Sequence, residues 1–248
     1  MSEGRDNDLL IGRNPVIEAL KSDAEIEKIY IAKGGTGSVE VIRQLAKDRG
    51  VRVDYVDRAR LDKLTEGLKH QGVAAVVSGF TYQELDDVFA KAAASGEAPF
   101  VVILDEIEDP HNLGAVIRTA ECAGAHGVII PKRRACGLTG AVAKAAAGAL
   151  ATMPVVRVTN LTRALDELKE RGLWIAACDM DGETYYKADL SGPIGIVVGN
   201  EGSGISRLVR EHCDFVVSIP LMGSINSLNA SNAAAVIMYE VRRRRSGM

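Results

Sequence analysis

Arg118 is the charged side chain best suited to chemistry in the segment 105–125, DEIEDPHNLGAVIRTAECAGA. An arginine binds phosphate through its planar N–H donors and stabilises developing negative charge. His111 or Asn112 is expected to cap the helix that carries Arg118, and a helix N-terminus is itself an anion-binding site. Arg118 follows Asn112 by six residues, about 240° around a helix, so the two do not automatically share a face. Taken alone, the segment is equally well explained by a capped helix with a solvated arginine.

Glu201 is the acid in the second segment of interest, 195–206, which reads GIVVGNEGSGIS. The glycines around Glu201 permit positive φ and a close approach of a ligand to the backbone. Their spacing differs from the GxGxxG fingerprint, and the segment lies near the end of the chain rather than after its first strand. A tight turn with a surface acid is the simpler interpretation. A carboxylate that follows an apolar strand also accepts hydrogen bonds from a ligand, which favours a site.

The third segment, 219–240, passes from an apolar strand end through a polar loop into an apolar helix. Pro220 breaks the strand ladder, and Asn229 or Ser231 is expected to cap the helix. Residues 222–231 include no acid, base or cysteine. A plain capped loop explains one serine and one asparagine, whereas the stretch 224–232 has six. This excess favours a binding site made of backbone groups and amides.

Short apolar runs alternate with helical patterns from Phe100 onward, which predicts an α/β domain with a parallel sheet covered on both faces. The expected strands lie within 100–106, 127–131, 153–158, 173–180, 194–200 and 214–220. Ligands of such sheets bind beyond the carboxyl ends of the strands. The loops after Asp105, Gly199 and Ile219 are therefore the places where a ligand site is expected. By periodicity alone, the sheet would be open and doubly wound.

The pattern before this sheet predicts a smaller α/β domain over residues 1–79, in which Asn14 caps a first helix and Pro15 lies in its first turn. Residues 80–98 combine a short helical segment with a Gly, Ala and Pro-containing stretch, and we interpret them as a linker. Residues 99–248 then form the second domain.

Composition gives limits rather than a function. The chain has 248 residues, 47% of them hydrophobic and 25% charged, which is ordinary for a globular protein, and its net charge of −3 gives no global sign of nucleic-acid binding. Its four cysteines form no CxxC pair, so neither a zinc knuckle nor a disulfide framework is indicated, and a reducing cytoplasm fits best. We expect neither a secretion signal nor a membrane-spanning segment.

The three segments, in this order, resemble the SpoU (TrmH-like) family of RNA ribose 2′-O-methyltransferases, which belongs to the knotted SPOUT class. The resemblance rests on NLGAVIRTAECAGA, VVGNEGSGIS and IPLMGSINSLNASNAAAVIMYE, and it spans roughly residues 100–245. Ala230 stands where many relatives have valine, a small apolar exchange. The front segment, with IGRNPVIEAL and HQGVAAVV, resembles the L30e-like RNA-binding domain that precedes the catalytic domain in the rRNA branch of the family.

The resemblance implies a C-terminal trefoil knot, through which the last helix is threaded, and a homodimer whose interface forms the site. Topology rules alone argue against a knot, because knots are very rare. The resemblance also implies S-adenosylmethionine as cofactor, held mainly by backbone groups of Gly199, Ile219 and Leu228. Main-chain N–H and C=O groups suit its adenine edge and hydroxyls. Transfer from a sulfonium requires no metal.

The implied reaction is an in-line attack of a ribose 2′-hydroxyl on the sulfonium methyl. In the family, the arginine that matches Arg118 acts as the base from the partner subunit, with help from the target phosphate. A charged guanidinium could instead clamp the phosphate and stabilise the alkoxide, since arginine rarely loses its proton. Asn112, Glu201 and Asn229, with Ser227 as a companion, are expected to orient the ribose, phosphate or arginine. Helix capping alone remains open for Asn229, and a surface acid for Glu201.

Basic residues provide candidate RNA contacts. They are Arg13 beside the first helix, and Lys132, Arg133 and Arg134 in PKRRACG. The terminal VRRRRSGM is either a basic RNA-binding patch or a run of cations favourable at a helix C-terminus. The single Trp174 is predicted to belong to the core rather than to a base-stacking platform.

The resemblance is strongest to the bacterial branch that methylates a guanosine in the peptidyl-transferase P-loop of 23S rRNA. The expected partners are therefore 23S rRNA or a pre-50S particle and a second copy of the chain, with no membrane. A tRNA 2′-O-methyltransferase is the nearest alternative, and a non-catalytic RNA-binding factor of the same fold is another. A nucleotide-dependent oxidoreductase is disfavoured, because no glycine fingerprint follows VVILDE.

Overall fold

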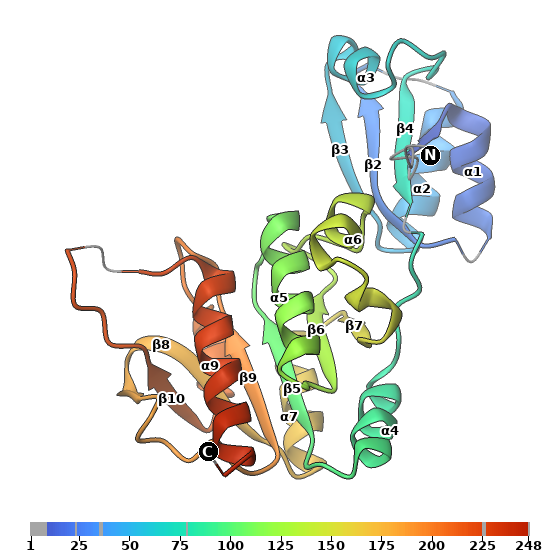
Figure 1. The fold of residues 1–248 in the computed structure, drawn as a ribbon. Coiled ribbons are helices and arrows are strands. Elements are labelled where there is room, and N and C mark those ends of the chain that lie inside the picture. The colour runs from blue at the N-terminus through green and yellow to red at the C-terminus, as the bar shows by residue number, and fades with distance from the viewer. Residues whose placement is uncertain (1–8, 23, 35–36, 78, 225–226, 248) are drawn as a thin grey trace, which may run out of the picture. The chain divides into compact units, whose positions relative to one another are not determined.

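The computed structural model describes residues 9–22, 24–34, 37–77, 79–224 and 227–247. The chain divides into two compact units, one of residues 1–81 with 137–141 and the other of residues 82–136 with 142–248 (Figure 1). Within the described part of the chain, no helix combines the length and apolar content that a membrane crossing requires.

The first unit is a four-stranded sheet with the strand order β1-β4-β2-β3. Its elements are β1 (Leu9–Ile11), α1 (Arg13–Lys21), β2 (Ile26–Ala32), α2 (Ser38–Asp48), β3 (Arg52–Val56), α3 (Arg58–Leu64) and β4 (Val73–Val77). Helices α1 and α2 bury Val16 and Ile42 against Ile29 and Ile31 of β2. Helix α3 contributes Leu61 to a separate small cluster.

Helix α1 begins differently from the prediction, which placed Asn14 at the cap. Gly12 occupies the cap position with φ 101°, and its N–H donates to the carbonyl of Val73. Because this positive φ and the pairing to β4 turn the chain into the helix one residue before Asn14, Asn14 lies inside the first turn. Gly12 has no side chain to cap the helix, and Oε1 of Gln71 lies 3.5 Å from the backbone N of Arg13.

The second unit is built on a six-stranded sheet with the order β10-β8-β9-β5-β6-β7, in which every neighbouring pair is parallel. Its elements are α4 (Leu85–Ser95), β5 (Phe100–Leu104), α5 (Pro110–Cys122), β6 (Gly127–Pro131), α6 (Gly140–Ala146), a 3₁₀ turn η1 (Ala149–Ala151), β7 (Val155–Val158), α7 (Leu161–Glu170), β8 (Trp174–Thr184), β9 (Ile194–Val198), α8 (Arg207–Glu211), β10 (Phe215–Ser218) and α9 (Ala230–Arg245). Strands β5 and β9 are buried along their whole length, as their unbroken apolar runs predict.

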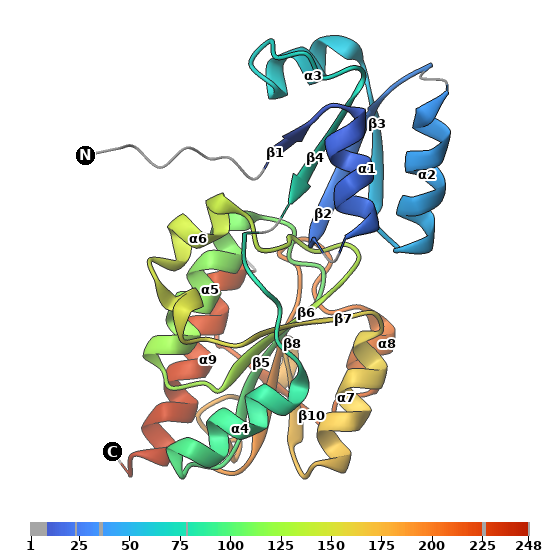
Figure 2. The ribbon, with the colours of Figure 1, turned by 90° about the vertical axis from the view of Figure 1, so that its right-hand side faces the viewer.

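Helices cover both faces of this sheet, and α5 packs against α9 while α7 lies on the opposite side (Figure 2). Strand order decides the position of the site. Because β9 lies next to β5, the loops that follow these two strands emerge next to one another. The loop after β10 joins them from the neighbouring edge.

Residues 80–98, which we predicted as a linker, contain helix α4. Its N-terminus carries a capping box, in which the backbone N–H of Glu84 donates to Asp87 at 2.9 Å. Leu85 and Val88 are buried in the same cluster as Val101 of β5. This part of the segment therefore packs into the core of the second unit.

The arginines at the end of α9 are engaged with the second unit itself. Arg242 pairs with Glu97 at 2.9 Å, and Arg245 donates to the carbonyls of Ala98 and Pro99. The buried Glu240 accepts hydrogen bonds from the two arginines that lie three and four residues further on. These contacts anchor the last helix and favour the structural interpretation of the tail over the RNA-binding one.

The prediction that Trp174 belongs to the core is wrong. Its side chain is 62% exposed, although the residues that follow it in β8, Ile175 to Ala177, are fully buried. Trp174 is the first residue of the strand, at the edge of the buried stretch. An apolar neighbourhood in the sequence therefore did not imply burial of its first member.

His126 gives a prediction about acid stability. Its ring is 2% exposed, Nδ1 accepts the N–H of Phe100 at 2.9 Å, and Nε2 lies 3.0 Å from the hydroxyl of Ser95. Burial, reinforced by the charge of Arg245, lowers the pKa of His126 from 6.5 to about 4. The unfolded chain therefore binds a proton more readily, and stability is lost as pH falls from about 6.5 towards 4.

We expect His126 to account for on the order of 2–3 kcal/mol of unfolding free energy that disappears across this pH range. Urea denaturation at several pH values between 4 and 7 measures it. His126→Gln should flatten the dependence, while the exposed His111→Gln should leave it as in the wild type. An unchanged slope in His126→Gln would contradict this assignment.

Candidate active site at the carboxyl ends of the sheet

A pocket of about 300 Å³ lies beside the middle of β8, where β9 and β10 end and α9 begins. It is lined by Cys178, Asp179, Met180, Val198, Gly199, Asn200, Glu201, Gly202, Ser203, Gly204, Ile219, Leu221, Ser227, Leu228, Ala230 and Ala233. Three of these, Gly199, Ile219 and Leu228, are the residues that we expected to hold a cofactor. The expected site residues Glu201 and Ser227 line it as well.

Gly199 begins a loop that folds back on itself. The N–H of Asn200 donates to the carbonyl of Gly204 at 3.0 Å, and the N–H of Gly204 donates back at 2.8 Å. A Cβ on Gly199 would lie 2.3 Å from the carbonyl carbon of Gly204, which no side chain tolerates. The loop therefore presents bare backbone to the pocket, as the glycine-rich pattern predicted.

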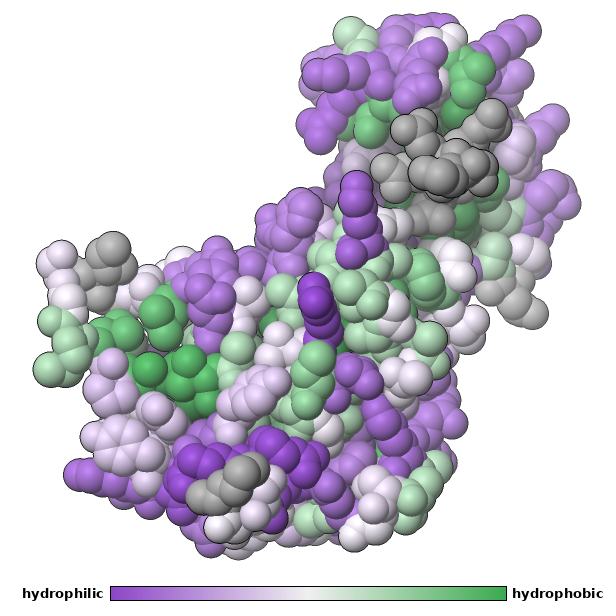
Figure 3. Space-filling model, in the orientation of Figure 1, coloured by the Kyte–Doolittle hydropathy of each residue, from purple (hydrophilic) through white to green (hydrophobic). Residues whose placement is uncertain are grey.

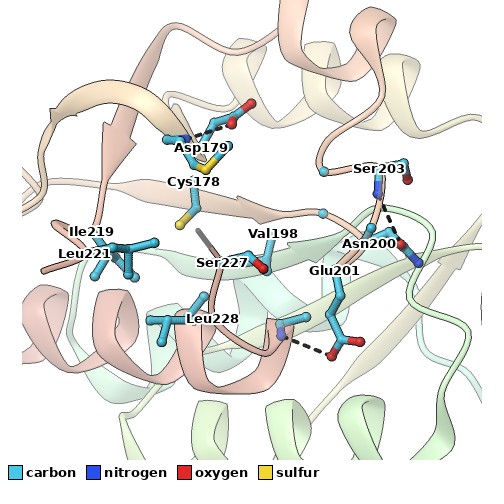
Figure 4. Close-up of a pocket in the computed structure, with 16 residues that line it drawn as sticks. Cys178, Asp179, Val198, Asn200, Glu201, Ser203, Ile219, Leu221, Ser227 and Leu228 are labelled. Atoms are coloured by element: carbon cyan, nitrogen blue, oxygen red, sulfur yellow. Dashed lines mark hydrogen bonds between the residues drawn. The ribbon is translucent and has the colours of Figure 1, made fainter. Parts of the chain in front are cut away.

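The walls of the pocket are largely apolar. Figure 4 shows Val198, Ile219, Leu221 and Leu228 around the cavity, with the sulfur of Cys178 pointing into it. Burial raises the pKa of the Cys178 thiol to about 11, so it is neutral at physiological pH. Apolar side chains also gather on the outer surface of this region, where Figure 3 shows them over the loop before α9. Such walls and a main-chain rim suit a flat heterocycle and its ribose.

Sequence reasoning missed Cys178 and Asp179 at this pocket. A signal for them existed, because they directly follow the apolar run of β8 and lie at its carboxyl side. What the sequence did not provide was the pairing of β8 with β9, which brings Cys178 level with Val198.

A hydrogen-bonded network lies beside the pocket and joins three loops. Oε1 of Glu201 accepts from Nδ2 of Asn112 at 2.7 Å, from Nδ2 of Asn229, and from the N–H of Ala230 at 3.3 Å. Nδ2 of Asn229 also lies 2.9 Å from Oδ1 of Asn112. The structure thus brings together three of the side chains that we expected to orient a substrate.

The N-terminus of α5 differs from the prediction, which gave its cap to His111 or Asn112. Asp109 is the cap, and its Oδ1 accepts the N–H of His111 at 2.7 Å and that of Asn112 at 3.0 Å. Pro110 occupies the first turn, where its missing N–H costs nothing. Since Asp109 performs the capping, the amide of Asn112 is available to Glu201.

Asn229 takes part in two sets of hydrogen bonds, one that caps α9 and one within the network. Its Oδ1 accepts the backbone N–H groups of Ser231 at 3.0 Å and Asn232 at 3.3 Å and so caps α9, while its Nδ2 belongs to the network. The two functions use different atoms. Substitutions can therefore separate them.

Asn229→Asp should keep the cap, because a carboxylate oxygen still accepts the two N–H groups, but it removes the donor and places a second charge beside Glu201. We expect turnover to fall by about tenfold with little change in thermal stability. Asn229→Ala should lower turnover similarly and also cost about 1 kcal/mol of stability through the lost cap. Turnover assays paired with thermal melts measure both effects. Normal turnover in Asn229→Asp would show that the amide serves only as a cap.

Arg118 stands apart from this network within one chain. It is exposed on α5, does not line the pocket, and makes no hydrogen bond or ion pair with the described residues. Among the described residues, the lining of the pocket in turn includes no lysine or arginine. The second unit therefore contains an arginine, Arg118, that pairs with no described residue, and a pocket with no lysine or arginine among its described lining residues.

The expected RNA contacts differ in their surroundings. Arg134 is exposed but pairs with Glu106 at 2.9 Å, and Lys132 and Arg133 are exposed beside it. In the first unit, Arg13 donates from Nε to the carbonyl of Gln71 at 2.9 Å and is held within that unit. The loop of 132–134 is thus the more accessible of the two basic sites.

The family model for the SpoU rRNA methylase family matches residues 99–239, which is more than half of the chain. A second model, described as RNA 2′-O ribose methyltransferase substrate binding, matches residues 9–83. The chain belongs to the SpoU family. A relative from Bacillus subtilis strain 168, the putative TrmH family tRNA/rRNA methyltransferase YacO, is 49% identical over 242 residues and 97% of either chain.

Solved SpoU structures agree with this assignment. The SpoU methyltransferase AviRb from Streptomyces viridochromogenes, in complex with its cofactor AdoMet, is 27% identical over 97% of this chain and 91% of its own, with a TM-score of 0.62. The TrmH/SpoU tRNA modifying enzyme of A. aeolicus is 27% identical over 61% of this chain and 77% of its own, with a TM-score of 0.55.

Membership settles the class of protein. The second unit has the knotted SPOUT methyltransferase fold rather than the open doubly wound sheet that periodicity alone suggested. The chain is an S-adenosylmethionine-dependent RNA methyltransferase of the SpoU family, and its first unit is the RNA substrate-binding domain. The bare backbone at Gly199 and the apolar pocket walls fit the cofactor that the family uses.

Proposed function

We propose that this SpoU methyltransferase transfers the methyl group of S-adenosylmethionine to the ribose 2′-hydroxyl of a guanosine in the peptidyl-transferase P-loop of 23S rRNA. It acts in the cytoplasm as a homodimer. The observation that carries the proposal is the contact between the Glu201, Asn112 and Asn229 network and the pocket at Gly199. A cofactor site thereby adjoins a cluster of groups that recognise a hydroxyl.

The pocket supplies the first part of the mechanism. The backbone at Gly199, Ile219 and Leu228 is placed to hold the adenosyl moiety, whose sulfonium, when bound, provides an electrophilic methyl group. The apolar walls exclude water from the transfer. Fixing the acceptor oxygen in line with that methyl contributes up to roughly 7–11 kcal/mol of rate acceleration in favourable cases.

The network supplies the second part by orienting the ribose. Oε1 of Glu201 is occupied by three donors, while Oε2 accepts no hydrogen bond from the described residues. Oε2 is therefore available to a ribose hydroxyl or to a guanidinium. Asn112 and Asn229 hold the carboxylate rigidly, so it needs no reorganisation when the substrate arrives. Ser227, at the rim of the pocket, is placed to assist.

Arg118 supplies the third part from the partner subunit. A pocket without a lysine or arginine in its lining has no cation for the target phosphate, and Arg118 has no partner among the described residues of its own chain. A homodimer that brings Arg118 of one subunit to the network of the other explains both observations. The arginine then has a partner, and the site then has a cation. There Arg118 clamps the phosphate and stabilises the developing alkoxide.

The rRNA target is supported by the substrate-binding model over residues 9–83 and by the rRNA methylase model over 99–239. The likeness to the A. aeolicus tRNA modifying enzyme covers only 61% of the chain, whereas that to an rRNA methyltransferase from Sinorhizobium meliloti covers 95%. In addition, Lys132 and Arg133 are exposed for contacts to phosphate. These observations favour rRNA over the tRNA alternative.

Deletion of the gene, followed by mapping of ribose methylations across rRNA and tRNA, tests the proposal. We expect one 2′-O-methylguanosine of the 23S P-loop to disappear and to return with the wild-type gene but not with Arg118→Ala. Loss of a tRNA methylation instead would identify the alternative substrate. Full retention of every ribose methylation would refute the catalytic assignment.

A further inference from the structure

The loop that carries Glu201 is held at both ends by the segment that follows β5. At its first end, Nδ2 of Asn200 donates to the carbonyl of Glu106 at 3.0 Å. At its far end, the N–H of Ser206 donates to Oδ2 of Asp105 at 2.7 Å. Two adjacent residues, 105 and 106, therefore fix a loop that lies about a hundred positions further along the chain.

Asp105 is a buried acid, 4% exposed, in surroundings made by an apolar sheet. A carboxylate in such a place is unfavourable unless it is hydrogen-bonded. Its contact with the N–H of Ser206 provides that bond, and its own N–H donates to the carbonyl of Val198, the residue at which β9 ends. Asp105 thus links the strand end to the far side of the loop.

Asn200 holds the near side with both ends of its amide. While Nδ2 donates to Glu106, Oδ1 accepts the N–H of Gly202 at 2.8 Å and that of Ser203 at 3.4 Å (Figure 4). These bonds fix the backbone on either side of Glu201. Glu106 itself has φ 59°, a conformation rare for residues with side chains, and its carbonyl accepts the hydrogen bond from Asn200.

The position of Glu201 depends on this attachment. Its side chain is exposed, and the three donors to its Oε1 lie on α5 and at the start of α9 rather than on its own loop. A small shift of the loop relative to these helices therefore breaks the network. Displacements of about 1 Å are enough to slow positioned reactions strongly.

We propose that Asn200 and Asp105 are positioning residues for methyl transfer, forming a two-point clamp that sets Glu201 against Asn112 and Asn229. The inference rests on the proposed function, because it assigns Glu201 to that reaction. Neither residue touches the acceptor in this scheme. Both act through the loop.

A double-mutant cycle between Asn200→Asp and Glu201→Gln tests the clamp. The aspartate keeps an acceptor for Gly202 but has no donor for the carbonyl of Glu106. We expect kcat on rRNA to fall about tenfold in the wild-type background but less than about threefold in the Glu201→Gln background. A purely structural contribution would give equal losses in both backgrounds, and that result would overturn the proposal.

Two substitutions of Asp105, one that keeps an acceptor oxygen and one that removes it, test its contribution. Asp105→Asn keeps an acceptor oxygen for Ser206 and should recover most of the kcat that Asp105→Ala loses. The matched control is Glu108→Gln, which neutralises an exposed acid three residues away that makes no hydrogen bond with the described residues. Equal kcat values for the alanine and asparagine variants would exclude the bond to Ser206 as the cause.

S-adenosylmethionine affinity, measured by calorimetry, requires no RNA and separates this inference from the choice of substrate. Because Gly202 and Gly204 line the pocket whereas Asp105 does not, a displaced loop in Asp105→Ala should weaken cofactor binding at least about threefold, with Glu108→Gln unchanged. Unchanged affinity would contradict the clamp even if the RNA target were correct. If the cofactor affinities of the variants were as expected but the wild type methylated no rRNA, only the proposed function would be contradicted.

Discussion

Arg118→Ala is expected to lower the rate of methyl transfer by about 10²- to 10³-fold while S-adenosylmethionine affinity stays within about twofold of wild type. The physical reason is that the guanidinium is the one cation proposed for the reacting phosphate and alkoxide, whereas it does not line the cofactor pocket. Single-turnover methylation and calorimetry on the same protein measure the two quantities. A parallel loss of cofactor affinity would show that the substitution disturbs the fold.

Arg118→Lys should recover little activity, because an ammonium is a point charge and lacks the planar pair of donors that grips a phosphate. If the lysine variant were as active as wild type, a bidentate role would be excluded. The matched control is Arg207→Lys, since Arg207 is an exposed arginine of the short helix α8 and does not line the pocket. It should retain wild-type turnover.

The dimer adds a sharper test of Arg118. When Arg118→Ala is mixed and re-associated with a variant that cannot bind the cofactor, half of the sites in each mixed dimer combine an intact pocket with an intact arginine. Activity should therefore return to about a quarter of wild type, although each parent is inactive. No recovery after verified subunit exchange would place Arg118 in the site of its own chain.

Gly199→Ala is expected to weaken S-adenosylmethionine binding by roughly 100-fold and to stop turnover at ordinary cofactor concentrations. The added Cβ would lie 2.3 Å from the carbonyl carbon and 2.4 Å from the oxygen of Gly204. Both atoms are backbone and belong to the paired loop, so the contact is relieved only by opening that loop. Calorimetric titration with the cofactor measures the effect.

Gly192→Ala is the control for this substitution, because an added Cβ at Gly192 meets nothing within 4 Å and the residue does not line the pocket. Cofactor affinity should then equal that of wild type. Tight binding in Gly199→Ala would mean that the loop opens at little cost, and the backbone cradle would have to be assigned elsewhere.

Local patterns predicted much of this molecule because they follow from short-range geometry. Unbroken apolar runs such as that of β9 indicated buried parallel strands, and the glycines around Glu201 indicated a backbone-lined loop. Local patterns gave the wrong prediction at positions whose structure depends on a neighbouring residue or element. Asp109 rather than Asn112 caps α5, and Trp174 lies exposed at the start of a strand.

The sequence by itself determined the family, the cofactor class and the residues of three loops, since motif order and residue type are properties of the chain. Only the tertiary structure decided that Asn112, Glu201 and Asn229 meet, although they are separated by 28 to 117 positions. The reason is strand order. With β9 next to β5, loops distant in the chain emerge side by side, and no local pattern encodes which strands become neighbours.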